Sequence, residues 1–286
     1  MEQKIIDLYD RYTHGGLSRR AFFDRLVVLA GGTAAATALL PVLENNYAHA
    51  ETVAENDPRV KGEMVTFKAG AQDLGGYLAR PAADGKYPSV VVVHENRGLN
   101  PHIKDVARRL AAAGNLALAV DFLSPIGGTP ADQDKARDMI GTLKAEDVTS
   151  WAQGAVTYLR GNPSSNGKVG AVGFCWGGGV IGRLAVADPT LDAAVVYYGQ
   201  QPPAKDVARI KAPLLLNYAG LDERIDAGIP AFEEALKQNG KEYTLYVYDG
   251  ANHAFNNDTN AARYNKEAAD LAWGRTLAFF QKHLAA

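Results

Sequence analysis

The residues best suited to chemistry in this chain are a cysteine, an aspartate and a histidine. Cys175 is the single cysteine and lies in the glycine-flanked segment GFCWG (173–177). Asp222 and His253 follow in that order, each just past an apolar run. A thiol can attack a carbonyl carbon, an imidazole can take the thiol proton, and a carboxylate can orient the imidazole. The set predicts nucleophilic acyl transfer with these three residues as the catalytic groups.

A glycine-flanked cysteine is a weak signal when it is taken alone, because a buried and inert cysteine is the common alternative. Its partners change the interpretation. Asp222 follows the run PLLLNY (213–218) and His253 follows YTLYVY (243–248), and α/β sheets place functional groups just past the carboxyl ends of their strands. The glycines around Cys175 suit a tight strand-to-helix turn, and the helix N-terminus there favours a thiolate.

Two backbone N–H groups are expected to form an oxyanion hole. One belongs to Trp176, directly after the cysteine, and the other to Asn96, in the loop after the apolar run SVVVVH (89–94). Donors aimed at a developing oxyanion stabilise the transition state of acyl transfer. Tyr198 is expected to line the substrate pocket, with packing in the core as the alternative for such an aromatic residue.

These residues need a scaffold of alternating strands and helices, and the sequence predicts one. Apolar runs typical of buried strands cover 89–94, 116–121, 169–174, 193–198, 213–218 and 243–248. Helical patterns cover 103–113, 131–143, 145–160, 176–187, 229–238 and 261–283. Two opening strands, 64–68 and 75–80, are expected to form an antiparallel hairpin. The alternation predicts one α/β domain, residues 51–286, with a mostly parallel, doubly wound sheet and helices on both faces.

Several segments of this domain resemble the dienelactone hydrolase family, the carboxymethylenebutenolidases of the α/β-hydrolase superfamily. They are VVVHENRGLN (91–100), DFLSP (121–125), GFCWGGG (173–179), AGLDERI (219–225) and GANHAF (250–255). The resemblance implies the α/β-hydrolase fold and hydrolysis of a small ester or enol-lactone. It carries the family's catalytic Cys, Asp and His onto Cys175, Asp222 and His253.

The resemblance also implies supporting residues. Glu95 takes the place of the family's strand-end glutamate, which contacts the resting thiol and controls its ionisation. The family binds a substrate carboxylate with two arginines; Arg137 is a candidate for one of them, and Arg97 offers a different carboxylate contact. Asn257 stands where the family's second arginine is expected. The substrate itself is therefore left open, and neither a cofactor nor a metal is expected.

Two other functions fit the same fold: an exported carboxylesterase of broad range, and a hydrolase-fold binding protein without turnover. Either would take a small-molecule partner. The net charge is −2, from 30 Lys and Arg against 32 Asp and Glu, so no strong overall field favours nucleic acid. A single cysteine excludes an intramolecular disulfide. We expect a monomer.

Residues 1–50 have the pattern of an export signal. Arg19 and Arg20 precede the uncharged run 26–43, and AHA (48–50) is a small-residue cleavage pattern. A basic region, an apolar region and such a site are typical of secretory signals, and the arginine pair resembles the twin-arginine (Tat) signal.

This pattern predicts transient contact with the Tat export machinery and a mature protein that begins at Glu51, in the periplasm or outside the cell. An uncleaved membrane anchor and an ordinary N-terminal helix are the two alternatives. Residues 1–16, separately, have the pattern of a short amphipathic helix.

Overall fold

The computed structural model describes residues 1–49 and 51–285, and its centre is an eight-stranded sheet with the order β1-β2-β4-β3-β5-β6-β7-β8. The strands are β1 (Val60–Ala69), β2 (Gln72–Pro81), β3 (Tyr87–Val93), β4 (Leu116–Asp121), β5 (Ser165–Phe174), β6 (Ala193–Tyr197), β7 (Leu214–Ala219) and β8 (Tyr243–Tyr248). From β4 to β8 along this order the strands pair in parallel, whereas β2 is antiparallel to both β1 and β4. The expected mostly parallel sheet and its opening hairpin are confirmed.

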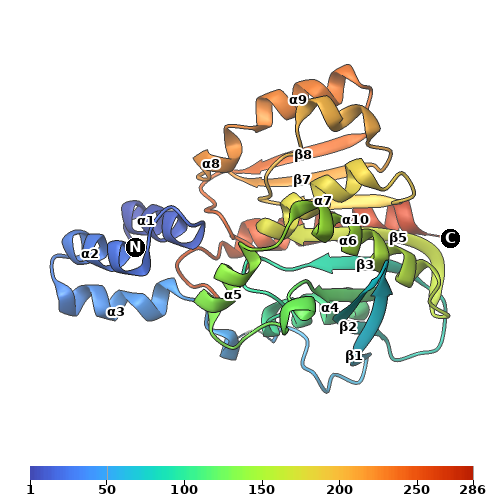
Figure 1. The fold of residues 1–286 in the computed structure, drawn as a ribbon, viewed down its shortest axis with the longest axis horizontal. Coiled ribbons are helices and arrows are strands. Elements are labelled where there is room, and N and C mark those ends of the chain that lie inside the picture. Colours follow the sequence, from blue (N-terminus) through green and yellow to red (C-terminus); the bar gives the residue numbers. More distant parts are fainter. Residues whose placement is uncertain (50, 286) are drawn as a thin grey trace.

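Helices alternate with the strands along the chain (Figure 1). They are α1 (Gln3–Thr13), α2 (Arg19–Ala30), α3 (Thr33–Leu43), α4 (Pro101–Ala112), α5 (Gln133–Ile140), α6 (Ala145–Arg160), α7 (Trp176–Ala187), α8 (Glu223–Asp226), α9 (Ile229–Gln238) and α10 (Lys266–Leu284). Short 3-10 turns lie at Tyr47–His49, Ser124–Ile126 and Ala204–Arg209. Residues 261–265, expected to belong to the last helix, form a turn instead, because Asn265 caps α10 by accepting from the N–H of Ala268.

Each face of the sheet carries its own apolar core. On one face, α6, α7 and α9 bury side chains such as Val156, Ile181 and Phe232 against the strands. On the other face, α4 and α10 bury side chains such as Val106 and Phe280. The central strands are apolar throughout because both of their faces are covered, which is why they read as continuous runs in the sequence.

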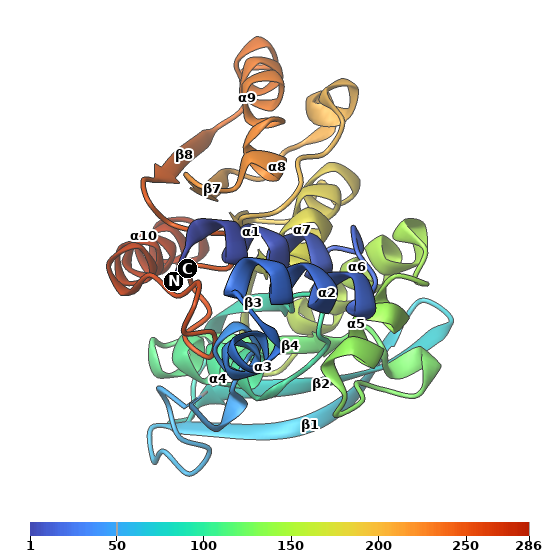
Figure 2. The same cartoon turned by 90° about the vertical axis from the view of Figure 1, so that its left-hand side faces the viewer.

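Helices α1, α2 and α3 lie together at one end of the molecule, beside the ends at which the parallel strands finish (Figure 1). They share a small apolar core, in which the rings of Tyr12 and Phe22 stack with centroids 4.6 Å apart and Leu26 and Leu43 are fully buried. In the end-on view, α1 crosses in front of the sheet (Figure 2). The amphipathic helix expected within residues 1–16 is confirmed as α1.

Hydrogen bonds attach this N-terminal segment, residues 1–49, to the α/β domain. The hydroxyl of Tyr12 donates to Asp134 at 2.6 Å, and the amide of Asn260 donates to the carbonyl of Leu43 at 2.6 Å. The boundary between residues 50 and 51 stays a prediction, and Ala50, the proposed cleavage residue, lies outside the described residues.

Among the described helices, no single one is both long enough and apolar enough to cross a bilayer. Helices α2 and α3 meet the length and composition requirements only as a pair, and they are bent by 114° with respect to each other.

Candidate active site

Cys175 lies at a strained turn between the end of β5 and the start of α7. Its φ angle is +56°, a backbone conformation that is rare for residues other than glycine. A Cβ on Gly173 would come within 2.2 Å of the carbonyl oxygen of Gly177, and a Cβ on Gly177 would come within 2.5 Å of the carbonyl oxygens of Val93 and His94. Only glycine fits at these two places, so the sequence pattern around the cysteine has a steric cause.

His253 and Asp222 come from the loops after β8 and β7, as expected. Nδ1 of His253 lies 2.5 Å from Oδ2 of Asp222, and both side chains are buried. Because Nδ1 donates this hydrogen bond, Nε2 is left as the acceptor of the neutral ring. That Nε2 has no hydrogen-bond partner among the described residues.

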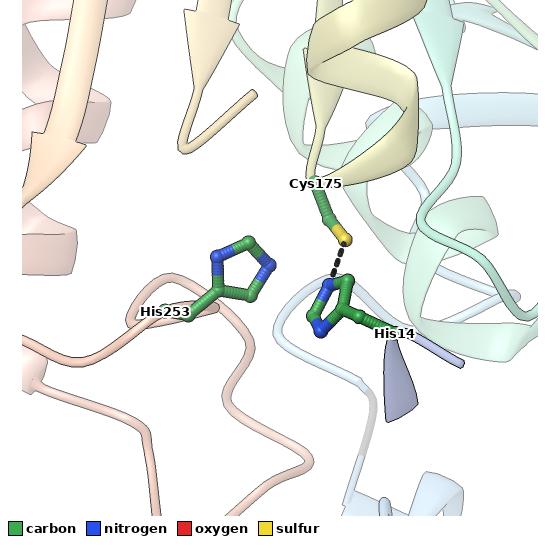
Figure 3. Close-up of side chains that lie close together, drawn as sticks. All are labelled: His14, Cys175 and His253. Carbon is green, nitrogen blue, oxygen red and sulfur yellow. Dashed lines mark hydrogen bonds between the residues drawn. The ribbon is translucent and has the colours of Figure 1, made fainter. Parts of the chain in front are cut away.

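The thiol of Cys175 has a partner that the sequence did not indicate. Nε2 of His14, at the C-terminal end of α1, lies 3.3 Å from Sγ of Cys175. The rings of His14 and His253 meet edge to face with centroids 4.7 Å apart. Figure 3 shows the two imidazoles reaching the thiol region from different segments of the chain.

These neighbours set the charge of the thiol. Burial alone would raise the pKa of Cys175, but the adjacent His253 and His14 lower it to about 6. Burial likewise disfavours the charged form of His253, yet Asp222 and Cys175 raise its pKa well above the usual value. For His14, burial is again opposed by Cys175 and Asp10, and the pKa is raised. The site therefore favours a thiolate beside an imidazolium near neutral pH.

The expected oxyanion residues and Tyr198 lie around the same cavity, which has a volume of about 620 Å³. Asn96 and Trp176 both line it, and the side-chain amide of Asn96 donates to the carbonyl of Thr13 at 2.7 Å. Tyr198, with a φ of +38°, also lines it and points its hydroxyl at Glu95.

The carboxylate of Glu95 is buried, and its hydrogen bonds go elsewhere than to the thiol. Oε2 accepts from the amide of Asn257 at 2.7 Å, and Oε1 lies 3.4 Å from the hydroxyl of Tyr198. In this structure the thiol is held by His14, and Glu95 is held by the residue that replaces the expected arginine.

The two arginines expected to bind substrate are in different surroundings. Arg137 lines the cavity, where it pairs with Asp134 at 3.1 Å and with Asp138 at 2.8 Å. Arg97 does not line this cavity; it is buried beside a smaller one that also touches Cys175 and Glu95.

Two further cavity residues were missed from the sequence. Arg183 on α7 lines the cavity, forms no ion pair among the described residues, and leaves its buried Nε without a hydrogen-bond partner. Arg224 lines it as well, 3.4 Å from Nδ1 of His253. Arg183 lies about two turns into α7, the helix that follows Cys175, and lines the same cavity as Cys175.

The comparison with known sequences identifies the family. A sequence model of the dienelactone hydrolase family matches residues 74–284. The chain belongs to the dienelactone hydrolase family. A second model, described as YqhI-like, matches residues 1–30, which include α1 and His14.

Individual relatives of the family agree with this placement. A Bradyrhizobium protein named "Probable 2-oxo-3-(5-oxofuran-2-ylidene)propanoate lactonase" is 35% identical over 222 residues, which cover 73% of this chain and 89% of the relative. A Saccharolobus solfataricus protein, by name a candidate carboxymethylenebutenolidase, is 32% identical over 258 residues, which cover 76% of this chain and 97% of the relative.

Solved structures give the same answer for the fold. A candidate dienelactone hydrolase from Klebsiella pneumoniae superposes with a TM-score of 0.71 at 27% identity, covering 78% of this chain and 99% of that one. The dienelactone hydrolase of Anabaena variabilis superposes with a TM-score of 0.61 at 24% identity, covering 79% and 100%. The expected α/β-hydrolase fold is confirmed, and as a dienelactone hydrolase family member the chain is a hydrolase of ester or lactone bonds.

One group of three described residues also has the side-chain types of a metal site. The donor atoms of His14, Cys175 and His253 lie within 4.8 Å of one another. We interpret them as a thiol with two neighbouring imidazoles and not as metal ligands, because the contact between His14 and Cys175 has the geometry of a hydrogen bond.

Proposed function

We propose that Cys175, His253 and Asp222 carry out the hydrolysis of a small, negatively charged ester or enol-lactone. The observation that carries this proposal is the elbow cysteine with a low pKa, close to a histidine that a buried carboxylate orients. In this proposal the thiolate attacks the carbonyl carbon, and the N–H groups of Trp176 and Asn96 stabilise the oxyanion.

Proton transfer completes the cycle. The bond between the carbonyl carbon and the leaving oxygen breaks, and that oxygen takes a proton from the imidazolium of His253. The neutral Nε2 then takes a proton from water, whose oxygen attacks the thioester and releases Cys175 as a thiolate. Asp222 holds Nδ1–H throughout and stabilises the charged ring.

Replacing the nucleophile tests the catalytic assignment. Cys175→Ala should lower kcat/KM for aryl esters and enol-lactones by about a thousandfold or more, because the covalent step is lost. Rapid-quench mass spectrometry of the native protein should trap an acyl group on Cys175. Full activity of the alanine variant would contradict the assignment.

Three arginines around the cavity support an anionic substrate. Arg137 and Arg224 have acidic neighbours, whereas Arg183 has no ion pair among the described residues, and burial lowers its pKa. A substrate carboxylate would supply the missing counter-charge of Arg183.

Arg183→Gln should raise KM for a carboxylate-bearing ester about tenfold or more and leave KM for a neutral aryl ester nearly unchanged. Arg209→Gln, at an exposed position, is the control.

A broad-range carboxylesterase is the second candidate, and the nucleophile discriminates it. A family enzyme tuned to a thiolate should lose turnover in Cys175→Ser, since a serine hydroxyl is not ionised by these neighbours. A serine variant with faster turnover of simple neutral esters would favour the carboxylesterase. Native protein that never acylates on any substrate of a broad panel would favour a binding protein.

Export is proposed separately, on the arginine pair and the apolar run of the N-terminal segment. Replacing both Arg19 and Arg20 by lysine should stop Tat-dependent export to the periplasm, whereas Arg11→Lys should not. Fractionation followed by N-terminal sequencing measures both location and cleavage. A periplasmic protein that begins at Glu51 agrees with the proposal, and a protein that stays inside the cell contradicts it.

A further inference from the structure

His14 lies where two helix ends meet. It is the C-cap residue of α1, and Cys175 is the N-cap residue of α7. The C-terminal end of a helix favours a cation and the N-terminal end favours an anion. An imidazolium on His14 and a thiolate on Cys175 are therefore each stabilised by their own helix, as well as by each other.

The hydrogen bonds of His14 determine which of its two ring nitrogens carries the proton in the neutral ring. Nδ1 lies 2.8 Å from the backbone carbonyl of Asp10 and 3.2 Å from its carboxylate. A carbonyl oxygen can only accept, so Nδ1 carries a proton. In the neutral ring Nε2 is then an acceptor, and at 3.3 Å from Sγ it can take the thiol proton.

The Asp10–His14 pair partly resembles Asp222–His253. In both, a carboxylate lies near Nδ1 and Nε2 is turned to the thiol region, but Nδ1 of His253 bonds its carboxylate, whereas Nδ1 of His14 lies closer to the backbone carbonyl of Asp10. Asp10 is kept ionised, because His253, His14 and Arg263 outweigh the effect of burial and lower its pKa.

The position of His14 is fixed by contacts of its neighbours. The carbonyl of Thr13 accepts the 2.7 Å hydrogen bond from Asn96, which lies on the loop proposed for the oxyanion hole. Tyr12, two residues before His14, is bonded to Asp134. Gly15, with a φ of +80°, ends α1 directly after the histidine.

From this arrangement we propose that His14 is a second catalytic histidine, and that the N-terminal segment is part of the working active site of the full chain. In the resting enzyme the proton of Cys175 moves from Sγ to Nε2 of His14, which leaves a thiolate beside an imidazolium backed by Asp10. His253, whose raised pKa keeps its ring protonated, then holds its own Nε2 proton for the leaving group, and its neutral ring takes a proton from water afterwards. This role rests on the proposed nucleophile, but it concerns the resting thiol and not turnover.

The charged and titratable groups around this pair come from several elements. His253, Tyr198 and Glu95 lie near the thiol, and Asp10 and Arg263 lie on the far side of His14. Among the described residues, His14 is the one whose side chain lies within hydrogen-bonding distance of the thiol. A change at His14 should therefore be visible directly in the titration of Cys175.

The experiment is the pH dependence of alkylation of the full chain by iodoacetamide. Cys175 is the single cysteine, so the rate reports one thiol. The variants are His14→Gln and Asp10→Asn, and Lys4→Gln is the matched control because Lys4 is exposed on the same helix. Mass spectrometry checks that residues 1–50 are retained, and circular dichroism checks that each variant is folded.

The native protein should show a midpoint near pH 6. Loss of a cation in contact with a thiolate should raise this midpoint by about 1 unit or more in His14→Gln, with a smaller rise in Asp10→Asn and none in Lys4→Gln. In the reciprocal measurement, the NMR titration of His14 should move to lower pH in Cys175→Ala.

Two results would overturn the proposal. One is an unchanged alkylation midpoint in folded His14→Gln. The other is a rise of kcat/KM in that variant, which would make His14 an obstacle to substrate. Alkylation needs no substrate turnover, so a normal shift in a protein that hydrolyses no ester would contradict the proposed function alone.

Discussion

At the scale of single residues, the site surrounds one thiol with two imidazoles, each backed by a carboxylate. A single histidine would have to give up its contact with the thiolate in order to protonate the leaving group. With His14 near the thiol and Nε2 of His253 unpartnered, these tasks can be divided between two rings. The division also explains why Glu95 is free to bond Asn257 and Tyr198.

The pH profile of hydrolysis follows from these charges. Acylation needs a thiolate, so kcat/KM should rise with pH through a midpoint near 6, the lowered pKa of Cys175. It should fall again at higher pH, where His253, whose pKa is raised, loses the proton that the leaving group needs. Steady-state kinetics across this range measure both limbs. A profile whose acid limb lies at the pKa of an ordinary thiol would contradict this charge assignment.

Much of the residue-level site could be predicted from the sequence, because its signals are local. Cys175, Asp222 and His253 each follow a recognisable strand, and the sheet brings strand ends together. His14 could not be predicted, because its contact with Cys175 spans 161 positions. Its segment also carries an arginine pair and an apolar run, which export signals share with a docked helical hairpin.

At the scale of elements, the elbow depends on how closely α7 approaches β3. Gly177→Ala would push a methyl group against the carbonyls of Val93 and His94, so it should destabilise the protein by about 2 kcal/mol or more and displace the nucleophile. Gly274→Ala, in α10, meets nothing within 4 Å and should stabilise by about 0.5–1 kcal/mol. Urea unfolding measures both, and equal effects would contradict the steric argument.

The alternation of strands and helices is the part of the fold that sequence predicts best, because both-face burial makes strands such as β4 apolar throughout. The N-terminal helices follow another rule. They bury only one side each, around Phe22 and Leu26, so their pattern does not distinguish a docked hairpin from a segment to be removed.

The docking of α1 and α2 depends on Phe22, which is 2% exposed and packs between Tyr9 and Tyr12. Phe22→Ala should cost about 3 kcal/mol locally and loosen the N-terminal segment, and with it the contact of His14. Limited proteolysis should then cut near residue 16 much faster than in native protein. Val28→Ala, at a side chain that is 78% exposed, should behave as native. Equal cleavage rates in the two variants would contradict this account of docking.

At the scale of the whole molecule, the N-terminal segment and the active site are thermodynamically linked. His14 of the segment contacts Cys175, so a change at this thiol must change the stability of the segment's docking. For as long as residues 1–50 are retained, the site therefore belongs to two parts of the chain.

This linkage can be measured by hydrogen exchange. Alkylation of Cys175 removes a charge-assisted contact worth about 1.5–3 kcal/mol, so amide exchange in α1 should become about tenfold faster or more. Exchange in α6 and α9, neither of which contributes a residue to the lining of the cavity, should not change. Mass spectrometry of peptides from residues 1–30 measures the effect, and unchanged exchange there would show that docking does not depend on the thiol.

The ion pair between Arg19 and Asp134 and the burial of Phe22 have a consequence for the proposed export signal. An export receptor that reads the arginine pair must bind side chains that the folded chain already uses. Its apparent affinity is therefore reduced by the fraction of chains in which the segment is undocked. Any ligand that tightens the active site around His14 would reduce that fraction further. If the proposed export signal is used, occupancy of the cavity would therefore slow export.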